Sequence, residues 1–356
     1  MNSAVEFEID DIAFGGKGVG RLDGKAVFVP FTIEGERVAA RIVREKKNLA
    51  EAELETVLAP SPHRTTPECP YFGECGGCTY QHISYEHQLA IKAQQVEQTL
   101  RRIARLAEVP MQPIVPSPVA YAYRNRITVH ALDGVVGYFR REAHQLIDVE
   151  QCPIAAPAVN RALAELRARR PRDGHYTLRA HEGPRVFAQT NDAVAEALAR
   201  HVVGLMTGGG KLLVDAYCGA GFFAKRLTSL FERVLGLEWD RYAVALAQKD
   251  AAPNESYIAC DAGLELRHAL LSAEPASTSV IVDPPEAGLT DAVRRTLLEV
   301  PVNMLVYVSC NPATLARDLA QLHAAYATRS VTPFDMFPQT AEVEVAVELR
   351  PLSAER

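Results

Sequence analysis

From about residue 186 onward the sequence alternates apolar runs with amphipathic segments, and this alternation restricts the fold more than any other feature. Strand-like runs that are each followed by a helix-like segment are typical of a doubly wound sheet with parallel strands. The expected strands are residues 211–217, 233–239, 255–260, 278–283 and 303–309, and the expected helices are 221–231, 240–251, 290–299 and 312–324. Two further strand-like segments, 328–334 and 343–349, suggest a closing hairpin. We therefore predict an α/β, Rossmann-like domain over residues 186–356.

Three acidic residues stand where successive expected strands end: Asp215, Glu238 and Asp261. Ligands of open α/β sheets bind at the carboxyl ends of the strands, so these acids lie where a ligand is expected. The first strand runs into a glycine turn, in which Gly219 and Gly221 let the backbone approach a ligand closely. A carboxylate at Asp215 suits a cationic methionine group, and Glu238 is placed to bind ribose hydroxyls. The pattern favours S-adenosylmethionine over NAD. In the alternative interpretation, the acids only cap the helices that follow them.

The loops after the fourth and fifth expected strands are candidates for a reaction centre. The fourth strand leads into Asp283-Pro-Pro285, and the fifth into Ser309-Cys-Asn-Pro312. Cys310 therefore lies at the same sheet edge as the expected cofactor, just before a proline that opens the next helix. A helix N-terminus lowers the pKa of a nearby thiol, so we expect Cys310 to supply a thiolate. The alternative is a structural cysteine at a strand end.

A second group of cysteines lies far from Cys310 in the chain. Cys69, Cys75 and Cys78 are close together, and Cys152 is a candidate fourth member. A total of seven cysteines, without a secretion signal, argues against a disulfide framework and favours metal-binding or catalytic cysteines. Four thiolates suit either zinc or an iron–sulfur cluster. The two glycines before Cys78 suit a cluster, because their N–H groups can approach the sulfurs, but the spacing alone does not choose between the metals.

The remaining part of the chain indicates RNA contacts. Residues 1–59 read as short strands with glycine turns, which suggests a small β-barrel of a kind that often binds oligonucleotides. Residues 60–185 include an expected helix at 84–106 and the most basic part of the chain, and we expect a mixed α+β domain there. Arginines that are merely solvated are the alternative. The formal net charge of −6 argues only weakly against RNA, because an RNA site needs only a local basic patch.

Membrane association is not expected. No apolar stretch approaches the ~20 residues of a membrane span, and the acidic N-terminus lacks the apolar core of a secretion signal. We expect a cytoplasmic, monomeric protein with no membrane partner.

These motifs together resemble the RNA uracil-5-methyltransferase family, specifically the branch with an iron–sulfur cluster and an N-terminal TRAM domain. The resemblance covers almost the whole chain. It implies a TRAM barrel with an OB-like fold at 1–59, a central iron–sulfur and RNA-binding domain at 60–185, and a class I methyltransferase domain at 186–356. The helix at 84–106 is a candidate to pack on that last domain. The motifs that carry the resemblance are Cys69-Pro-Tyr-Phe-Gly-Glu-Cys-Gly-Gly-Cys-Thr-Tyr-Gln-His82, Phe187-Ala-Gln-Thr-Asn191, Asp215-Ala-Tyr-Cys-Gly-Ala-Gly221, Asp283-Pro-Pro285 and Ser309-Cys-Asn-Pro-Ala-Thr-Leu-Ala-Arg-Asp318.

The resemblance also implies three sets of site residues. Cys310 is the implied nucleophile and Glu344 the implied general base, with Asp283 at the active centre beside the cofactor and the target base. The residues implied to bind S-adenosylmethionine are Gln189, Tyr217, Glu238 and Asp261, again with Asp283 next to them. The residues implied to hold a [4Fe–4S] cluster are Cys69, Cys75, Cys78 and Cys152.

The implied reaction transfers a methyl group to carbon 5 of a flipped-out uridine through a covalent bond between Cys310 and uracil, in RNA that we expect to be 23S rRNA. Transfer RNA is the second choice. A catalytically idle RNA-binding or ribosome-assembly protein is the main alternative of another class, and an adenine methyltransferase and an NAD-dependent oxidoreductase are weaker ones. Two positions depart from the family pattern: Glu286 stands where arginine is common, and Glu342 where histidine is common. Both bear on the substrate rather than on the reaction, because neither replaces a residue assigned to the chemistry.

Overall fold

The computed structural model describes residues 4–181, 183 and 189–352, and the chain divides into two compact units. The N-terminal unit comprises Met1–Gln95, Pro118–Glu182 and Phe337–Glu342, and the α/β unit comprises Val96–Ser117, Gly183–Met336 and Val343–Arg356. The domain boundary expected at residues 185 and 186 lies outside the described residues. No helix in the described part of the chain is long and apolar enough to cross a membrane.

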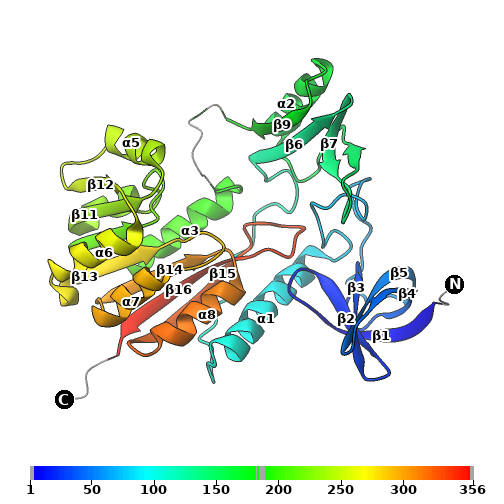
Figure 1. The fold of residues 1–356 in the computed structure, drawn as a ribbon, viewed down its shortest axis with the longest axis horizontal. Helices are drawn as coiled ribbons and strands as arrows, with labels where there is room; N and C mark the ends of the chain where they lie inside the picture. Colours follow the sequence, from blue (N-terminus) through cyan, green and yellow to red (C-terminus); the bar gives the residue numbers. More distant parts are fainter. Residues whose placement is uncertain (1–3, 182, 184–188, 353–356) are drawn as a thin grey trace. The chain divides into compact units, whose positions relative to one another are not determined.

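The α/β unit is built on a seven-stranded sheet with the order β12-β11-β10-β13-β14-β16-β15 (Figure 1). Neighbouring strands among the first five are parallel, and the last two form an antiparallel hairpin with β16 against β14. The expected strands and the closing hairpin are therefore confirmed. The strands are β10 (Gly210–Ala216), β11 (Phe231–Glu238), β12 (Glu255–Ala259), β13 (Thr278–Val282), β14 (Met304–Ser309), β15 (Tyr326–Phe334) and β16 (Glu344–Pro351).

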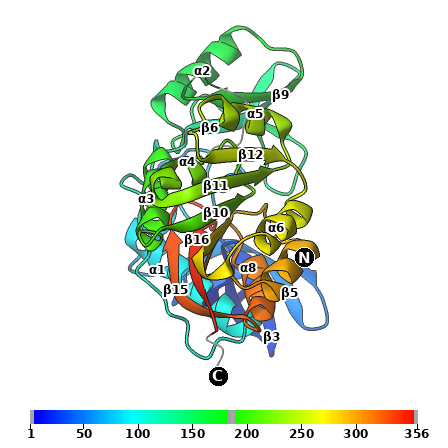
Figure 2. The same cartoon turned by 90° about the vertical axis from the view of Figure 1, so that its left-hand side faces the viewer.

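Helices lie on both faces of this sheet. Figures 1 and 2 show α6, α7 and α8 on one face and α3 on the other. The helices of the α/β unit are α3 (Asp192–Leu205), α4 (Ala224–Leu227), α5 (Arg241–Lys249), α6 (Ala262–Leu271), α7 (Asp291–Glu299) and α8 (Pro312–Leu322). The helix expected at 221–231 is wrong in length: only α4 and a 3-10 turn form there, and Phe231 already begins β11. The sequence analysis did not predict α3 and α6.

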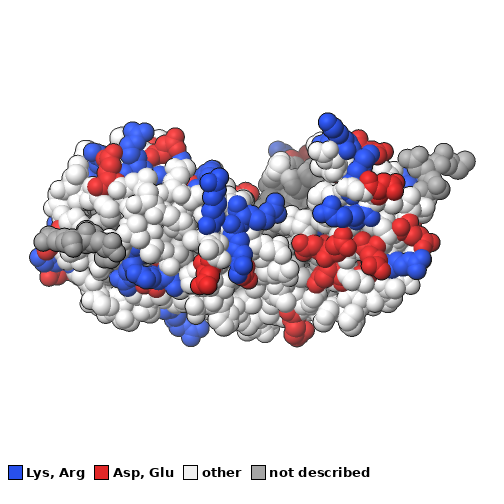
Figure 3. Space-filling view, turned by 90° about the horizontal axis from the view of Figure 1, so that it is seen from below, with Lys and Arg blue, Asp and Glu red and all other residues white. Residues whose placement is uncertain are grey.

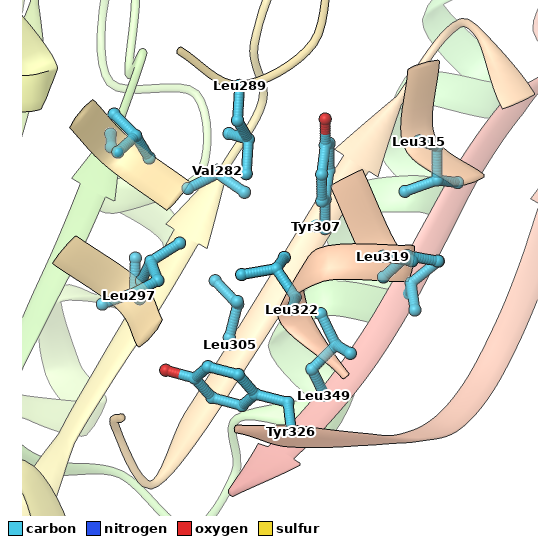
Figure 4. Close-up of a cluster of buried hydrophobic side chains, with 14 of the residues drawn as sticks. Val282, Leu289, Leu297, Leu305, Tyr307, Leu315, Leu319, Leu322, Tyr326 and Leu349 are labelled. Atoms are coloured by element: carbon cyan, nitrogen blue, oxygen red, sulfur yellow. The ribbon is translucent and has the colours of Figure 1, made fainter. Parts of the chain in front are cut away.

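A single apolar core holds α7 and α8 against the sheet. Figure 4 shows Tyr307 of β14 and Val282 of β13 facing leucines of the two helices, with the ring of Tyr326 below them. Strands β13 and β14 are buried along their whole length, as expected for parallel strands covered on both faces. Close packing of this kind fixes where each strand ends, and so it fixes the positions of the loops that carry function.

Helix α1 (Tyr85–Ile103) ends three residues before the expected end at residue 106. Its second half belongs to the α/β unit, where Val96 and Leu100 join the core around β14. Arg105 just beyond it has a φ of 57°, in the left-handed region where a helix cannot continue.

The N-terminal unit begins with a closed barrel of five strands in the order β1-β2-β3-β5-β4. Gly18 and Gly20 lie within β2 rather than in turns. Both positions need glycine for space, because a Cβ atom would come within 2.0 Å of Thr32 Oγ1 at Gly18 and 2.3 Å of the Glu8 carbonyl oxygen at Gly20. Figure 3 shows basic and acidic side chains mixed over the barrel at its right-hand end, and ion pairs such as Arg37–Glu6 join them. The strands are β1 (Val5–Ile12), β2 (Lys17–Leu22), β3 (Lys25–Pro30), β4 (Arg37–Glu45) and β5 (Leu49–Ala59).

A second, antiparallel sheet of the same unit has the order β8-β7-β6-β9. Helix α2 (Pro157–Ala168) covers one of its faces, where Val159 and Leu163 pack against Ile127 and Val129. Its strands are β6 (Arg126–Leu132), β7 (Val135–Phe139), β8 (Leu146–Asp148) and β9 (Gly174–Arg179). The result is a two-layer arrangement of one helix on one sheet.

Candidate active site

The sheet of the α/β unit brings Cys310 and Glu344 to the same edge. Strand β14 ends at Ser309, and β16 begins at Glu344 and runs antiparallel to it, with Ser309 opposite Val345. The next position along this register sets Cys310 opposite Glu344. Asp283 directly follows β13, the other neighbour of β14, so a thiol and two carboxyl groups from three adjacent strands meet at one place.

Cys310 is half-buried, and its surroundings hold the pKa of its thiol above the usual range, at about 12. Burial is the largest cause, and the charges of Glu344, Asp283 and Glu286 add to it. The prediction of a thiolate at Cys310 is therefore wrong for the chain without ligands. Burial and three carboxyl groups raise the thiol pKa more than the N-terminus of α8 lowers it. The structure places the residue where it was expected but in the protonated form.

The two carboxyl groups beside Cys310 are themselves perturbed. Burial raises the pKa of Asp283 to about 7. Burial also raises the pKa of Glu344 well above its usual value, and the charge of Asp283 adds to this shift. Two carboxylates in one poorly solvated place repel each other, so the pair holds a proton near neutral pH. This arrangement provides a carboxyl group that can accept or hold a proton beside the thiol.

The loop after β13 is anchored to α8 by a buried carboxylate. Asp318 is fully buried and accepts hydrogen bonds from Leu289 N at 2.8 Å, Arg294 Nη1 at 2.8 Å and the Tyr307 hydroxyl at 2.8 Å. Gly288, with a φ of 80°, packs so tightly there that a Cβ atom would lie 2.6 Å from Asp318 Oδ2. The sequence analysis quoted Asp318 within a motif but gave it no role.

Glu286 lies in this anchored loop, exposed and close to Cys310. Its Oε1 accepts a hydrogen bond of 3.3 Å from Asn311 Nδ2, and its backbone oxygen accepts one of 2.9 Å from Thr314 Oγ1. The departure at Glu286 therefore adds a carboxylate next to Cys310. Glu342, the other departure, is also exposed, and its backbone N–H donates to Thr340 Oγ1 at 3.2 Å.

A hollow of about 500 Å³ opens beside the glycine turn. Three of the expected cofactor residues line it: Gln189, Tyr217 and Asp283. Phe187 and Ala188 of the motif that contains Gln189 lie outside the described residues. The lining also includes groups that the sequence analysis missed, namely Asp192, Glu196, Phe222, Lys225 and Arg226. A concave site with both apolar and charged walls suits a cofactor with an apolar thioether-like chain and charged ends.

The glycine turn takes its shape from unusual backbone conformations. Tyr217 has a φ of 69°, a strained value for a tyrosine, and Gly221 has a φ of 84°. A Cβ atom at Gly221 would lie 2.9 Å from the Tyr257 hydroxyl, so this position also needs glycine for space. Strained residues cluster at ligand sites, and this turn forms part of the hollow wall.

The three acids at the strand ends have different surroundings. Asp215 is fully buried, and its Oδ2 accepts a hydrogen bond of 2.9 Å from Ala224 N at the start of α4. Asp215 does not line the hollow, so it is not placed for the expected contact with a methionine group. Burial raises the pKa of its carboxyl group to about 8. Asp261 caps α6 by accepting from Gly263 N at 2.7 Å. Glu238 instead holds the glycine turn, since its Oε2 accepts from Gly219 N at 2.9 Å.

A second hollow adjoins the chain positions of Glu238 and Asp261. Its lining consists of Trp239, Asp240, Arg241, Ala259 and Cys260. The side chain of Trp239 is 78% exposed, which is unusual for the only tryptophan of the chain. The only sequence signal for a ring-stacking position here is a tryptophan directly after a strand-end acid, and its exposure became visible only in the structure.

The four cysteines of the N-terminal unit are near one another without forming a ready ligand set. In the described chain, no group of three or more His, Cys, Asp or Glu residues has a geometry that could hold a metal ion. Burial raises the pKa of the Cys69, Cys75 and Cys78 thiols, and the charge of Cys152 raises all three further. Gly77 N donates to Cys75 Sγ at 3.4 Å, as its expected approach to the sulfurs requires.

Comparisons with known proteins identify RNA methyltransferases as relatives of this chain. Residues 171–259 and 265–351 match the family model described as tRNA (Uracil-5-)-methyltransferase, and residues 2–54 match the TRAM domain. An uncharacterized RNA methyltransferase of Bdellovibrio bacteriovorus is 32% identical over 379 residues, covering 98% of this chain and 96% of that protein. Another, of Nostoc, is 30% identical, covering 97% of this chain and 96% of that protein.

A solved structure shares the fold over nearly the whole chain. The crystal structure of the Pyrococcus abyssi tRNA (uracil-54, C5)-methyltransferase, in complex with S-adenosyl-L-homocysteine, has a TM-score of 0.75 and 24% sequence identity. The match covers 97% of this chain and 99% of that chain. The class I methyltransferase fold with an N-terminal TRAM barrel is thereby confirmed.

Proposed function

The chain belongs to the S-adenosylmethionine-dependent RNA uracil-5-methyltransferase family, and we propose that it methylates carbon 5 of a uridine through a covalent bond between Cys310 and the base. One observation carries the proposal: the register of β14 and β16 sets Cys310 opposite Glu344, with Asp283 beside them. A nucleophile and a separate carboxylate base are the minimum that this reaction requires.

The chemistry follows from the electronic structure of uracil. Carbon 5 is a poor nucleophile until the Cys310 sulfur bonds to carbon 6, which converts the ring to an enolate. S-adenosylmethionine supplies the methyl group that carbon 5 then takes up. Removal of the proton from carbon 5 re-forms the double bond to carbon 6 and expels the Cys310 sulfur as thiolate. The enzyme must therefore hold a base on the face from which that proton leaves.

Glu344 is the proposed base. Its raised pKa makes its carboxylate a stronger proton acceptor than an ordinary glutamate, which favours proton transfer from carbon. Asp283 shares the poorly solvated space and lets the pair hold one proton. Before attack the Cys310 thiol must pass its proton to water, and a neutral neighbour in the carboxyl pair lessens the repulsion that opposes thiolate formation.

The proposed cofactor site combines the two hollows at the sheet edge. Gln189, Tyr217 and Asp283 line the larger one, where Asp192 and Glu196 add carboxylates suited to the ammonium and sulfonium charges. Glu238 and Asp261 flank the smaller one by chain position, where a ribose and an adenine would be bound. Each oxygen of Glu238 already accepts one backbone hydrogen bond, from Gly219 N and from Asp240 N, so ribose hydroxyls would use the remaining lone pairs of the carboxylate.

The proposed domain roles follow the expected division into residues 1–59, 60–185 and 186–356, with the first two binding RNA. Cys69, Cys75, Cys78 and Cys152 are proposed to hold a [4Fe–4S] cluster. Their thiols lie within electrostatic range of one another, and the donor set suits iron and sulfide. A structural role is sufficient, because the methyl transfer involves no net change in oxidation state.

The proposed substrate is RNA with a flipped-out uridine, because a stacked base cannot reach both the thiol and the cofactor. We propose 23S rRNA as the target, with transfer RNA as the alternative, which the activity of the Pyrococcus abyssi protein favours. The test is methyl transfer from labelled S-adenosylmethionine to purified 23S rRNA and transfer RNA, followed by mapping of 5-methyluridine. Label in neither RNA, from folded protein that binds the cofactor, supports the idle RNA-binding alternative.

A further inference from the structure

Three pairs of identical residues face each other across strands β6 and β9. The antiparallel register sets Arg126 opposite Arg179, Thr128 opposite Thr177, and His130 opposite His175. Alternate residues of a strand point to the same face, so these six side chains form one continuous row, here called the paired ladder.

The paired ladder occupies the face of the sheet that α2 leaves uncovered. The alternate residues of β6, including Ile127 and Val129, are buried in the core beneath α2. In contrast, Thr128, His175 and Thr177 are exposed. Sheets of this type bury one face and present the other to solvent, so the ladder is a surface feature rather than part of the core.

Aromatic rings extend the ladder onto β7. The ring centroid of Phe139 lies 4.4 Å from that of His130, and the His175 ring lies 4.5 Å from His130 on the other side. His144 continues the row, with its ring 6.3 Å from Phe139. Between the rings and the arginines, the hydroxyls of Thr128 and Thr177 lie 3.2 Å apart. The face therefore combines rings in tilted and edge-to-face contact, hydroxyl groups and guanidinium groups.

The arginine charges of the paired ladder destabilise the sheet that carries them. Like charges directly opposite each other destabilise a sheet. Burial lowers the pKa of Arg126, and the charges of Arg179 and Arg124 lower it further, so three guanidinium groups are crowded together. The barrel of the same unit does the reverse and pairs Arg41 of β4 with Glu53 of β5. A local excess of positive charge on one sheet face favours a polyanion.

We propose that the paired ladder binds a single-stranded segment of the RNA substrate, with phosphates at Arg126 and Arg179 and bases stacked on His130 and Phe139. The proposal rests on the proposed function, in which the substrate is RNA. Arginine forks match phosphate oxygens in pairs, and rings that are partly exposed, such as those of His130 and Phe139, can stack on unpaired bases of any sequence. A duplex would not offer its bases to these rings, so the ladder selects an unpaired strand.

The test uses a carboxylate placed within the ladder and a matched control on the helix. The ladder variant is Thr128→Glu with Thr177→Glu, and the control is Ala164→Glu with Ala168→Glu, exposed positions on α2 that carry the same charge change. The probe is a fluorescein-labelled single-stranded RNA of mixed sequence, and a duplex of the same sequence serves for comparison. We expect the full-length ladder variant to bind the single strand about tenfold more weakly than wild type or control. The affinity for S-adenosylmethionine should be unchanged in both.

A second variant guards against misfolding. Arg179→Ala removes charge from the ladder without inserting a new one, and it should reduce the slope of log affinity against log salt by about 0.7, the value for one phosphate contact with a single strand. Three outcomes would each contradict RNA binding by the paired ladder. They are equal weakening of binding by the ladder and control variants, an unchanged salt slope in Arg179→Ala, and a stronger effect on duplex binding than on single-strand binding.

The two levels of the proposal fail in different ways. If wild-type protein methylates RNA but the ladder variant binds RNA as tightly as wild type, the ladder is wrong and the methyltransferase function stands. If wild-type protein neither binds nor methylates RNA, the proposed function is wrong and the ladder falls with it.

Discussion

The buried carboxylate of Asp318 accepts a hydrogen bond of 2.8 Å from the backbone N–H of Leu289. Asp318 lies on α8, which begins just after Cys310, and Leu289 ends the loop that begins with Asp283. This contact therefore ties the loop that carries Asp283 and Glu286 to the helix that follows the proposed nucleophile. Arg294 and Tyr307 bond to the same carboxylate, so one side chain holds four segments in register.

Asp318→Ala should lower the free energy of unfolding by about 3–5 kcal/mol, because it removes the buried carboxylate partner of the Arg294 guanidinium and leaves only the exposed Asp291. Chemical denaturation measures this loss. Tyr307→Phe is the matched control: it removes one hydrogen bond to the same carboxylate and should cost about 1–2 kcal/mol. A loss below about 1 kcal/mol in Asp318→Ala would show that the network does not hold the loop.

Cys310→Ala should abolish methylation and leave the affinity for S-adenosylmethionine nearly unchanged. Cys310 is absent from both hollows, whereas carbon 5 of uracil needs the thiol for activation. The rate of methyl transfer to RNA should fall by several orders of magnitude. Cys218→Ala is the control, since Cys218 lines the larger hollow and is buried. Turnover that survives in Cys310→Ala but is lost in Cys218→Ala would identify Cys218 as the nucleophile instead.

Glu344→Gln should trap a covalent complex of protein and methylated RNA. Without the base, the proton on carbon 5 stays in place and the bond to Cys310 persists. A denaturing gel shows such a complex as a slower band that contains both protein and RNA. The double variant Glu344→Gln with Cys310→Ala should give no band. A single variant that binds cofactor and RNA yet forms no complex would argue against Glu344 as the base.

Glu286→Gln should make the Cys310 thiol more reactive toward iodoacetamide. Removal of a nearby negative charge favours the thiolate, so the thiol pKa should fall below the value of about 12 in the wild type. At a fixed mildly alkaline pH, alkylation of Cys310 should quicken by a few-fold. The effect should shrink at high salt, because Glu286 is exposed and its field is screened. Glu232→Gln lies near the amino end of β11, at the opposite edge of the sheet from Cys310, and should leave the alkylation rate unchanged.

Protein purified without oxygen should be brown and contain about four irons per chain. Cys152→Ser should lose the iron, because it removes one of the four proposed ligands. Cys260→Ser, a partly exposed cysteine of the α/β unit, should keep it. Iron and sulfide analysis with visible absorption measures both. Stoichiometric zinc without iron in the anaerobic preparation would contradict the cluster.

The alternation of strands and helices was readable from the sequence because parallel strands covered on both faces are apolar along their length. Strands β13 and β14 are buried at every position, and each ends within one residue of its expected end. Helix boundaries were less readable. The expected helix at 221–231 depended on its residue types, but the left-handed conformations at Gly219 and Gly221 keep the chain in a turn until α4 begins.

Local rules failed where charges from several strands meet. The N-terminus of α8 predicted a thiolate at Cys310, whereas the carboxyl groups of Glu344, Asp283 and Glu286 raise the thiol pKa. Asp215 looked like a ligand contact by its place at a strand end, yet it is buried and holds the start of α4. Both outcomes depend on residues that are not adjacent in the chain. They could therefore not be predicted before the strands were placed side by side.

The sequence by itself determined the order of the strands in the α/β unit, the family motifs and the candidates for the reacting groups, because periodicity and motif spacing are local properties of the chain. Only the tertiary structure decided that Cys310 stands opposite Glu344, that Asp318 anchors the loop of Asp283, and that β6 and β9 pair like residues with like. These relationships depend on strand order and register, which are set by packing between segments far apart in the chain.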